Sequence, residues 1–212
     1  PSWGTTPVVY TPDGRIRPNG GSLGVYTAAV EPMSDCIVSF RLWWSPSWTG
    51  AYQLGIVARA NLDADTFYYC YYQADASGGA VNIGKRVAGS GSGLSGGFLG
   101  MAGVVTPRWA NNKGGYLDVS FMLVGDLIKL FVDGVERGST RDSGIPCGVP
   151  GIYNFTNTTD STGIHMESFS ARSLRGTPLS ARGTFYTANA QTMQFGGIRA
   201  VRSMVPPSSR VP

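Results

Sequence analysis

Two aspartates, Asp63 and Asp65, lie two residues apart in the segment LDAD. A pair of carboxylates that flanks a glycosidic bond can act as acid and nucleophile in glycoside hydrolysis. This segment has the composition of a turn, so we expect both side chains to be solvated. The chain has three glutamates, and none has another carboxylate two residues away: Glu31, Glu136 and Glu167. The sequence therefore predicts no catalytic residues and no enzymatic activity.

The single histidine, His165, is the one candidate base for nucleophilic catalysis by Ser or Cys. It lies in a strand-like segment without a nucleophile motif nearby, so we expect a structural role. The odd number and wide spacing of the cysteines fit neither a disulfide framework nor a zinc site. Cys36 and Cys70 lie in strand-like runs and are expected to be buried, whereas Cys147 follows a polar loop. One disulfide with one free thiol is the alternative.

Aromatic side chains are the most informative candidates, because exposed rings stack on sugars and anchor protein interfaces. The candidates for carbohydrate or interface contacts are Trp43, Trp48, Tyr52 and Trp109. Trp48 lies in a loop between Pro46 and Gly50, which favours exposure, although packing in the core or an interface is an equal alternative. The neighbouring Trp44 is expected in the core.

The elements that must position these side chains are strands. Apolar residues alternate with polar ones at the period of two that is typical of strands, and no window shows a helical period. The predicted strands are 36–44, 52–59, 66–73, 81–86, 116–124, 127–132, 148–155 and 163–172. Asp133-Gly134 predicts a type I′ turn, and the Gly/Ser-rich stretch 88–100 predicts a surface loop. Repeated strands and turns predict an all-β fold, a two-sheet antiparallel sandwich or jelly roll.

The segment YLDVSFMLVGDLIKLFVDGVERGSTRDSGIPCGVPGI resembles the late core of the concanavalin A-like lectin/glucanase superfamily, in its laminin-G-like branch. The residues that carry this resemblance are Leu130 to Gly134, Asp142-Ser143, Gly148 and Gly151-Ile152. GIVARANLDADTFYYC, residues 55–70, is similar to an earlier run of the same family. The resemblance covers about residues 35–172 and implies a sandwich fold more specifically than it implies a function.

Members of this superfamily include lectins, glycan hydrolases, adhesion modules and viral tail or fibre parts, so the fold alone does not define the function. The resembling hydrolases carry a Glu-x-Asp-x-Glu strand, which this sequence lacks. Laminin-G-like domains can hold calcium with loop aspartates and carbonyls. The candidates for such a site are Asp63, Asp65, Asp142 and Asp160. No dense cluster of carboxylates supports them, so we expect no metal and no other cofactor.

Segments 1–34 and 173–212 lie outside the predicted sandwich of residues 35–172. We interpret the first as an extended segment that partly joins the sandwich, and the second as a C-terminal arm. The residues expected to dock this arm are Arg182, Phe185, Tyr186, Phe195, Ile198 and Arg202. The net charge of +4 is spread along the chain, which argues against nucleic acid as a partner. No stretch approaches the ~20 apolar residues of a membrane span, so no membrane insertion is expected.

These features favour a non-enzymatic virion protein of a bacteriophage, as a tail, fibre or capsid-decorating component. Its expected partners are other virion proteins, copies of itself and, on the outward face of the sandwich, host-cell glycan. No signal-peptide pattern opens the chain, so we expect synthesis in the host cytoplasm and assembly into the virion. The alternative is a secreted, extracellular carbohydrate-binding module of a larger bacterial protein. If residues 173–212 pack on another chain, the virion hypothesis is favoured. If they fold back on their own sandwich, the hypothesis of a secreted carbohydrate-binding module is favoured.

Overall fold

The computed structural model describes residues 8–18, 24–28, 30–45, 52–75, 78–100, 115–154, 158–174, 184–187 and 192–194. The strands in this part of the chain are β1 (Val8–Tyr10), β2 (Ile16–Pro18), β3 (Gly24–Ala28), β4 (Cys36–Trp44), β5 (Tyr52–Asn61), β6 (Thr66–Asp75), β7 (Gly78–Val87), β8 (Ser90–Gly100), β9 (Tyr116–Val124), β10 (Leu127–Val132), β11 (Val135–Arg141), β12 (Val149–Asn154), β13 (Ile164–Ser173), β14 (Thr184–Thr187) and β15 (Thr192–Gln194). None of the described residues belongs to a helix that is long and apolar enough to cross a membrane.

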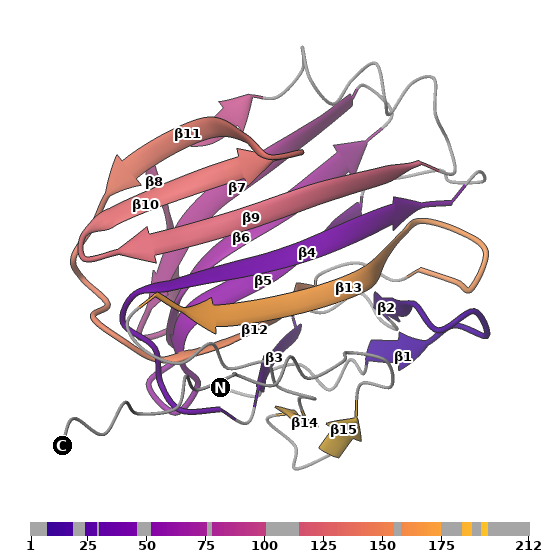
Figure 1. Ribbon diagram of the computed structural model, residues 1–212, viewed down its shortest axis with the longest axis horizontal. Coiled ribbons are helices and arrows are strands. Elements are labelled where there is room, and N and C mark those ends of the chain that lie inside the picture. The colour runs from indigo at the N-terminus through magenta and orange to yellow at the C-terminus, as the bar shows by residue number, and fades with distance from the viewer. Residues whose placement is uncertain are drawn as a thin grey trace, which may run out of the picture.

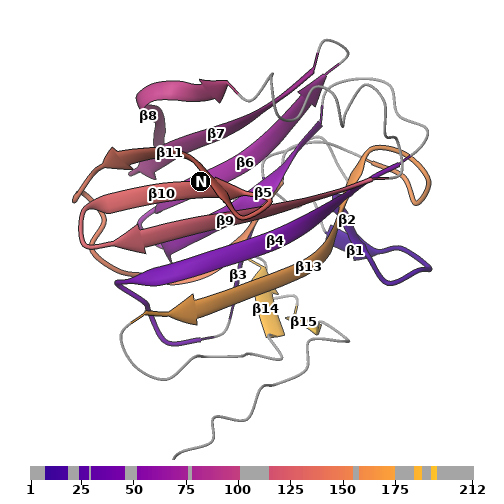
Figure 2. The ribbon, with the colours of Figure 1, turned by 45° about the horizontal axis from the view of Figure 1, so that its top comes forward.

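The strands form two antiparallel sheets that face each other, as Figure 1 and Figure 2 show. Sheet A has the order β1-β2-β13-β4-β9-β10-β11, and sheet B has the order β15-β14-β3-β12-β5-β6-β7-β8. Each strand presents one row of side chains to the space between the sheets and the other row to the outside. The predicted all-β, two-sheet antiparallel sandwich is therefore confirmed.

The core lies between the sheets and is built from alternate residues of long strands. In β4 every second residue from Cys36 to Trp44 is buried, and in β9 every second residue from Leu117 to Leu123 is buried. β10 adds Ile128, Leu130 and Val132, and the alternation seen in the sequence is confirmed in β4 and β9. Burying one such side chain contributes about 1.5–3 kcal/mol to the free energy of unfolding, which makes this row a main source of stability.

The β10–β11 hairpin closes as the sequence predicts. Asp133 and Gly134 both have positive φ, at 48° and 77°, and Val132 pairs with Val135 across the turn. A type I′ turn requires positive φ at both central residues, and its twist matches that of the flanking strands.

The prediction of a surface loop at residues 88–100 is wrong. Ser90–Gly100 forms β8, which pairs with β7 and lies at the edge of sheet B. The turn before it places Ala88 and Gly89 at positive φ. Glycine and serine reduce intrinsic strand propensity, but pairing with β7 uses the backbone, so a neighbouring strand overrides this weak preference.

The terminal segments contribute strands to both sheets. β1 and β2 form a hairpin, Val8–Pro18, that joins sheet A where Ile16 pairs with Met166 of β13. β3 lies inside sheet B, between β12 and β14. β14 and β15, two described stretches of the 173–212 segment, pair with each other and extend sheet B beyond β3. These described stretches fold back on their own sandwich, while the three-part division of the chain stays a prediction.

Candidate functional site

The outer face of sheet B, which points away from sheet A, carries a second apolar cluster. β6 alternates so that Tyr68, Cys70 and Tyr72 join the core, whereas Phe67, Tyr69 and Tyr71 point to the outer face. Phe67 is buried there with apolar side chains of neighbouring strands: Val25, Val57, Ala60 and Tyr153. Tyr69 and Tyr71 are partly exposed. This face therefore presents aromatic surface beside a buried apolar base.

Three tyrosines on this face form a compact stack, which we call the tyrosine stack: Tyr69, Tyr71 and Tyr153. The centroids of Tyr71 and Tyr153 are 5.1 Å apart with an interplanar angle of 12°. Tyr69 lies 5.8 Å from Tyr71 and 5.6 Å from Tyr153, at angles of 27° and 21°. Such offset stacking is a favourable geometry for aromatic rings and holds the three side chains in a fixed arrangement.

Two glycines make room for the tyrosine stack. Gly84 of β7 pairs with Tyr69, and a Cβ at Gly84 would overlap the Tyr69 ring. Gly55 of β5 lies in register between Tyr71 and Tyr153, and a Cβ there would overlap the backbone of β6. Glycine in a strand interior often marks close approach of another group, and here a tyrosine ring lies directly over the β7 backbone.

Burial raises the pKa of the tyrosine hydroxyls in the stack. For Tyr69 and Tyr71 burial is the largest cause, and the same holds for Tyr153. All three phenols therefore stay protonated at neutral pH and can both donate and accept hydrogen bonds.

An ion pair lies at the β6–β7 end of the stack. Arg86 is paired in register with Phe67, and its guanidinium donates to both carboxylate oxygens of Asp65, at 2.7 and 3.0 Å. Asp65 is buried and has positive φ, so the expectation that its side chain is solvated is wrong, because Arg86 pairs with it. The guanidinium also acts to lower the pKa of Tyr69 and Tyr153, against burial, which places its charge close to the stack. Aromatic rings beside a fixed polar pair can hold a sugar ring by stacking and by hydrogen bonds to its hydroxyls.

The predicted site residue Trp43 lies on the outer face of sheet A, within contacts of the protein's own side chains. The Arg15 guanidinium lies 3.9 Å from the centroid of its ring, and the His165 ring centroid is 5.0 Å away. Trp43 is half-buried. Its role in carbohydrate or interface contacts stays a prediction. One face of its ring is already in contact with the Arg15 guanidinium.

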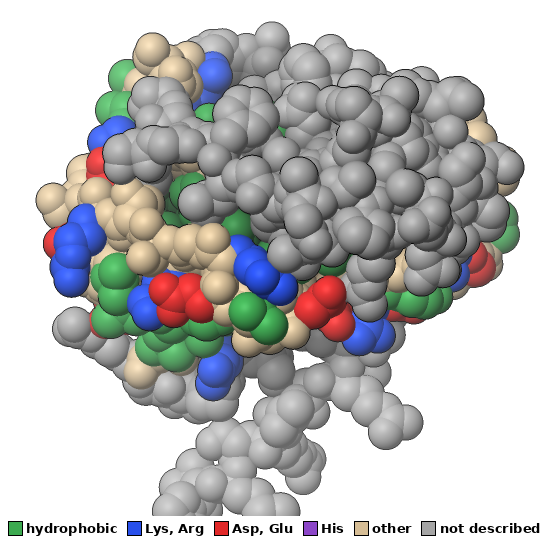
Figure 3. Space-filling view, turned by 90° about the horizontal axis from the view of Figure 1, so that it is seen from above, with side chains coloured by type: hydrophobic (Ala, Val, Ile, Leu, Met, Phe, Trp, Pro, Cys, Tyr) green, Lys and Arg blue, Asp and Glu red, His purple; other side chains and the backbone are tan. Residues whose placement is uncertain are grey.

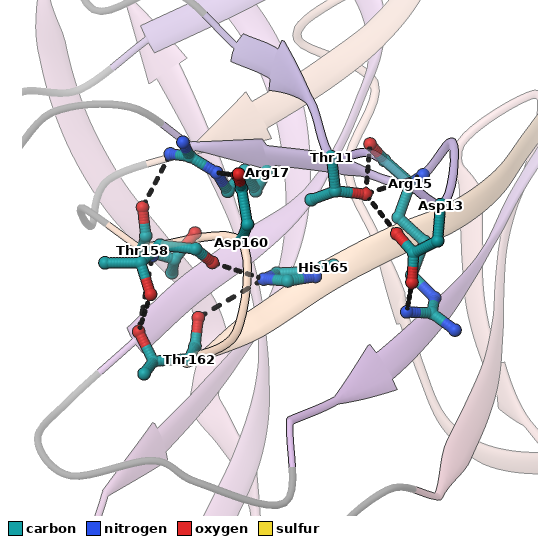
Figure 4. Close-up of polar contacts among 9 residues, drawn as sticks. Thr11, Asp13, Arg15, Arg17, Thr158, Asp160, Thr162 and His165 are labelled. Carbon is teal, nitrogen blue, oxygen red and sulfur yellow. Dashed lines mark hydrogen bonds and ion pairs between the residues drawn. The ribbon is translucent and has the colours of Figure 1, made fainter.

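His165 is fully buried beside Trp43, with 0% of its surface exposed. Figure 4 shows it between the 158–163 loop and the turn that carries Thr11, Asp13 and Arg15. Its Nε2 lies 2.9 Å from the carbonyl oxygen of Thr159 and 3.2 Å from that of Thr162. Burial is the largest cause that lowers its pKa, so the ring is neutral at neutral pH. The expected structural role fits these contacts.

The other predicted aromatic and arm residues are less fully described. Trp48, Trp109, Arg182, Phe195, Ile198 and Arg202 lie outside the described residues, whereas Tyr52 lies in β5 and Phe185 and Tyr186 lie in β14. The backbone of β14 pairs with β3, opposite Tyr26 to Ala28. The role of these residues in docking stays a prediction.

The four aspartates named as calcium candidates do not come together. Asp65 is held by Arg86, and Asp160 lies 2.5 Å from Nε of Arg17. Asp142 pairs with Lys85 and accepts a hydrogen bond from the Tyr68 hydroxyl, while Asp63 is exposed on a turn. Within the described part of the chain, no group of three His, Cys, Asp or Glu side chains could hold a metal ion.

The three cysteines are free. Cys36 and Cys70 are buried, as predicted, and burial raises the pKa of the Cys36 thiol to about 11 and that of Cys70 further. Cys147 is exposed.

On the outer face and edge of sheet A, basic side chains are paired with acidic ones. Arg41 binds Asp118 through two hydrogen bonds of 2.7 and 2.8 Å, and Lys129 lies 2.7 Å from Glu136. Figure 3 shows basic and acidic side chains interspersed with hydrophobic ones along the described surface in that view. This surface differs from the single-sign stripe that is typical of nucleic-acid binding.

The sequence did not single out the tyrosine stack. Its signal was present in TFYYCYYQ, because a strand with tyrosines at adjacent positions must place some of them on each face. To recognise Tyr69 and Tyr71 as part of a site, one would have to know that Tyr153, more than eighty residues later in the sequence, lies beside them.

Comparison with solved structures finds proteins that share this fold. The carbohydrate-binding module CBM66 from Bacillus subtilis matches with a TM-score of 0.60 and 16% identity, over 80% of this chain and 92% of that one. The CBM2 module of the evolved Dit of Lactobacillus casei BL23 phage J-1 matches with a TM-score of 0.50 and 11% identity, over 78% of each chain. A tetrameric galectin from the ball sponge Cinachyrella sp. matches with a TM-score of 0.45 and 18% identity, over 70% of this chain and 98% of that one.

No protein-family model matches the sequence, and no curated protein matches it either. At these identities the structural matches establish the fold. The chain has the concanavalin A-like lectin/glucanase fold, which confirms that part of the resemblance seen in the sequence.

Proposed function

We propose that this protein binds carbohydrate through the outer face of sheet B. The observation that carries the proposal is the tyrosine stack beside the Arg86–Asp65 pair. The partly exposed rings of Tyr69 and Tyr71 offer apolar surface for the C–H groups of a sugar, and the phenols and the ion pair offer hydrogen bonds to its hydroxyls. A structural match that is itself a carbohydrate-binding module supports this use of the fold.

The protein acts in this proposal without catalysis. Asp65 is already hydrogen-bonded by Arg86, so it is not available as a nucleophile or a base without breaking that pair. The phenols of Tyr69 and Tyr71 have a raised pKa, which disfavours their ionised form. An assay for new reducing ends on polysaccharides that bind the protein tests this point, and release of such ends would contradict it.

The finer proposal is a place in a bacteriophage virion, as a tail, fibre or capsid-decorating component. The support is the match to a module of a phage Dit. In this role the sandwich faces outward and binds host-cell glycan, while the termini bind virion proteins or further copies of the chain.

A secreted carbohydrate-binding module is the second candidate, and one observation favours it. β14 pairs with β3 of the same chain, so the described part of the 173–212 segment extends its own sheet. Light scattering with and without residues 173–212 distinguishes the two. A defined oligomer that becomes monomeric on truncation supports assembly, and a monomer in both forms supports the module.

A glycan-array screen tests the shared claim of carbohydrate binding. The full chain is compared with the variant Tyr71→Ala, which removes a partly exposed ring of the stack. We expect the full chain to retain a defined set of glycans and the variant to lose them. Equal retention by both proteins, or no retention by the full chain at any concentration tested, contradicts the proposal.

A further inference from the structure

The hydrogen bonds of His165 define its protonation state. Its Nε2 lies within hydrogen-bond distance of two carbonyl oxygens, those of Thr159 and Thr162. A carbonyl oxygen accepts hydrogen bonds and donates none, so Nε2 must carry the proton. The neutral ring then leaves Nδ1 bare. This nitrogen is buried and has no hydrogen-bond partner among the described residues.

A second proton on the ring would be poorly accommodated. It would place an N–H at Nδ1 without an acceptor, and burying an unsatisfied donor costs about 1–3 kcal/mol, with more for a charged group. The ring would also become a cation in a fully buried position. The neutral form, with its single proton on Nε2, is therefore the one that fits this packing.

The N-terminal hairpin, Val8–Pro18, is attached to the same surroundings. Arg17 of β2 donates to the Thr158 carbonyl at 2.7 Å and to Asp160 at 2.5 Å, and so holds the 158–163 loop that also accepts from His165. Arg15 lies over Trp43, whose ring is next to the imidazole. His165, the loop and the hairpin therefore form one connected set of contacts, of which Figure 4 draws the polar ones.

The backbone attachment of the hairpin is small. In the described part of the chain, β2 pairs with β13 at one position, Ile16 with Met166, and β1 pairs with β2. The side chains of Arg15 and Arg17 add to this attachment, together with Ile16, whose buried side chain belongs to the core cluster. A local change at the 158–163 loop that frees the hairpin must therefore also expose Ile16, while the other strands of the sandwich stay paired.

The charged groups around His165 already balance one another. From the hairpin come Asp13 and Arg15, which pair with each other, and Arg17, which pairs with Asp160 of the loop. From β4 comes Arg41, which pairs with Asp118 and lies 3.9 Å from Glu167 of β13. A new positive charge on His165 would meet no carboxylate that is free of a cation in this set.

We propose that His165 is a pH-dependent latch, which holds the N-terminal hairpin against sheet A when neutral and releases it when protonated. Protonation turns the ring into a group that its site cannot hold, so the ring and the 158–163 loop separate. Arg17 then loses its two partners on the loop. The released hairpin uncovers Trp43 and the buried side chain of Ile16 at the edge of sheet A. A protein with this latch changes the surface at one end of its sandwich as it moves from neutral to acidic surroundings.

Because the chain has one histidine, its NMR signals can be assigned without ambiguity. We expect the ¹⁵N shifts of the ring to show the Nε2–H form at pH 7.5. The amide hydrogen-exchange rates of residues 9–17 are corrected for the pH dependence of intrinsic exchange. As the pH is lowered below the onset of histidine protonation, these corrected rates should rise roughly tenfold for each pH unit. The amides of β9 and β10 should stay protected over the same range, and the two titrations should share a midpoint.

The variant His165→Gln is the matched control, because its amide can donate to the two carbonyls and does not titrate in this range. Its hairpin should exchange at a rate independent of pH after correction. Equal acceleration in the variant, or histidine protonation without faster exchange of the hairpin, would overturn the proposal. If the variant fails to fold, the shared midpoint in the unmodified chain decides: separate midpoints reject the latch.

Discussion

At the scale of single residues, Arg59 shows how a buried charge can organise the end of a sandwich. Its guanidinium donates to three backbone carbonyls, those of Ser34, Gly125 and Ile145, at 2.6, 2.9 and 2.9 Å. These carbonyls belong to three segments far apart in the sequence. Asp35 adds a carboxylate 3.8 Å away and accepts a hydrogen bond from the Gly125 N–H. With 2% of its surface exposed, Arg59 is satisfied by backbone rather than by water.

We expect Arg59→Met to lower the free energy of unfolding by about 3–5 kcal/mol, because it leaves the Asp35 carboxylate and three carbonyls without their buried partner. Urea unfolding measures the loss. The control is Arg41→Met, which removes an exposed ion pair with Asp118 and should cost about 0–1 kcal/mol. Equal losses in the two variants would refute the clamping role of Arg59.

A substitution at Gly84 can test glycan binding without disrupting the fold. A methyl group at Gly84 would meet the outer atoms of the Tyr69 ring, which can rotate away at little cost to the backbone. We therefore expect Gly84→Ala to fold, to change the near-ultraviolet circular dichroism of the tyrosines and to weaken glycan binding. Gly91→Ala, where a methyl group meets nothing within 4 Å, should leave both unchanged. A Gly84→Ala variant that binds glycan as well as the unmodified chain would show that the position of Tyr69 is irrelevant.

At the scale of elements, the strands that local pattern could specify were predicted from the sequence alone. β4, β9 and β10 match their predicted ranges because their apolar runs are bounded by turn residues, and β4 and β9 also alternate. β8 was missed because its stability comes from pairing with β7, which composition does not encode. The setting of Trp43 was missed for a related reason, since Arg15 and His165 arrive from distant parts of the chain.

The Asp133-Gly134 turn allows a test of how strongly the local sequence determines the structure. Gly134 has a φ of 77°, where a side chain disfavours the backbone by about 1–2 kcal/mol. We expect Gly134→Ala to lower the free energy of unfolding by this amount, because nothing lies within 4 Å of the added methyl group and steric overlap makes no contribution. Thermal unfolding followed by far-ultraviolet circular dichroism measures it. An unchanged melting temperature would mean that the turn adopts another backbone conformation.

At the scale of the whole molecule, stability should fall in two phases as the pH is lowered. Burial lowers the pKa of His165 below the unfolded value of 6.5. Below about pH 6.5 the unfolded chain therefore binds the proton first, and the free energy of unfolding decreases until the pH passes the folded pKa. For Asp142, burial alone would raise the pKa, but hydrogen bonds from Lys85 and Tyr68 outweigh it and the net shift is downward. Its contribution is full above 3.8 and is lost as the pH falls through the folded pKa.

Urea unfolding between pH 8 and pH 3 checks this expectation. The unmodified chain should show both phases, His165→Gln should lack the one that begins near pH 6.5, and Asp142→Asn should show a smaller loss in the acidic phase. A first phase that persists in His165→Gln would assign it to another group.

The claim that organises these observations is that the molecule binds carbohydrate with one face of one sheet. The two faces differ in kind: the outer face of sheet B is aromatic, and the outer face of sheet A carries paired charges. The decisive measurement is titration calorimetry of a glycan retained by the full chain against Tyr69→Ala, Tyr71→Ala and the control Tyr116→Ala. Tyr116 lies on sheet A and is 37% exposed, so its loss removes a comparable ring from the opposite layer.

We predict that each stack variant weakens the affinity about tenfold, which is about 1.4 kcal/mol and within the range for loss of one stacked ring. Tyr116→Ala should bind like the unmodified chain. Full affinity in both stack variants, or a loss confined to Tyr116→Ala, would contradict the assignment of the site to sheet B.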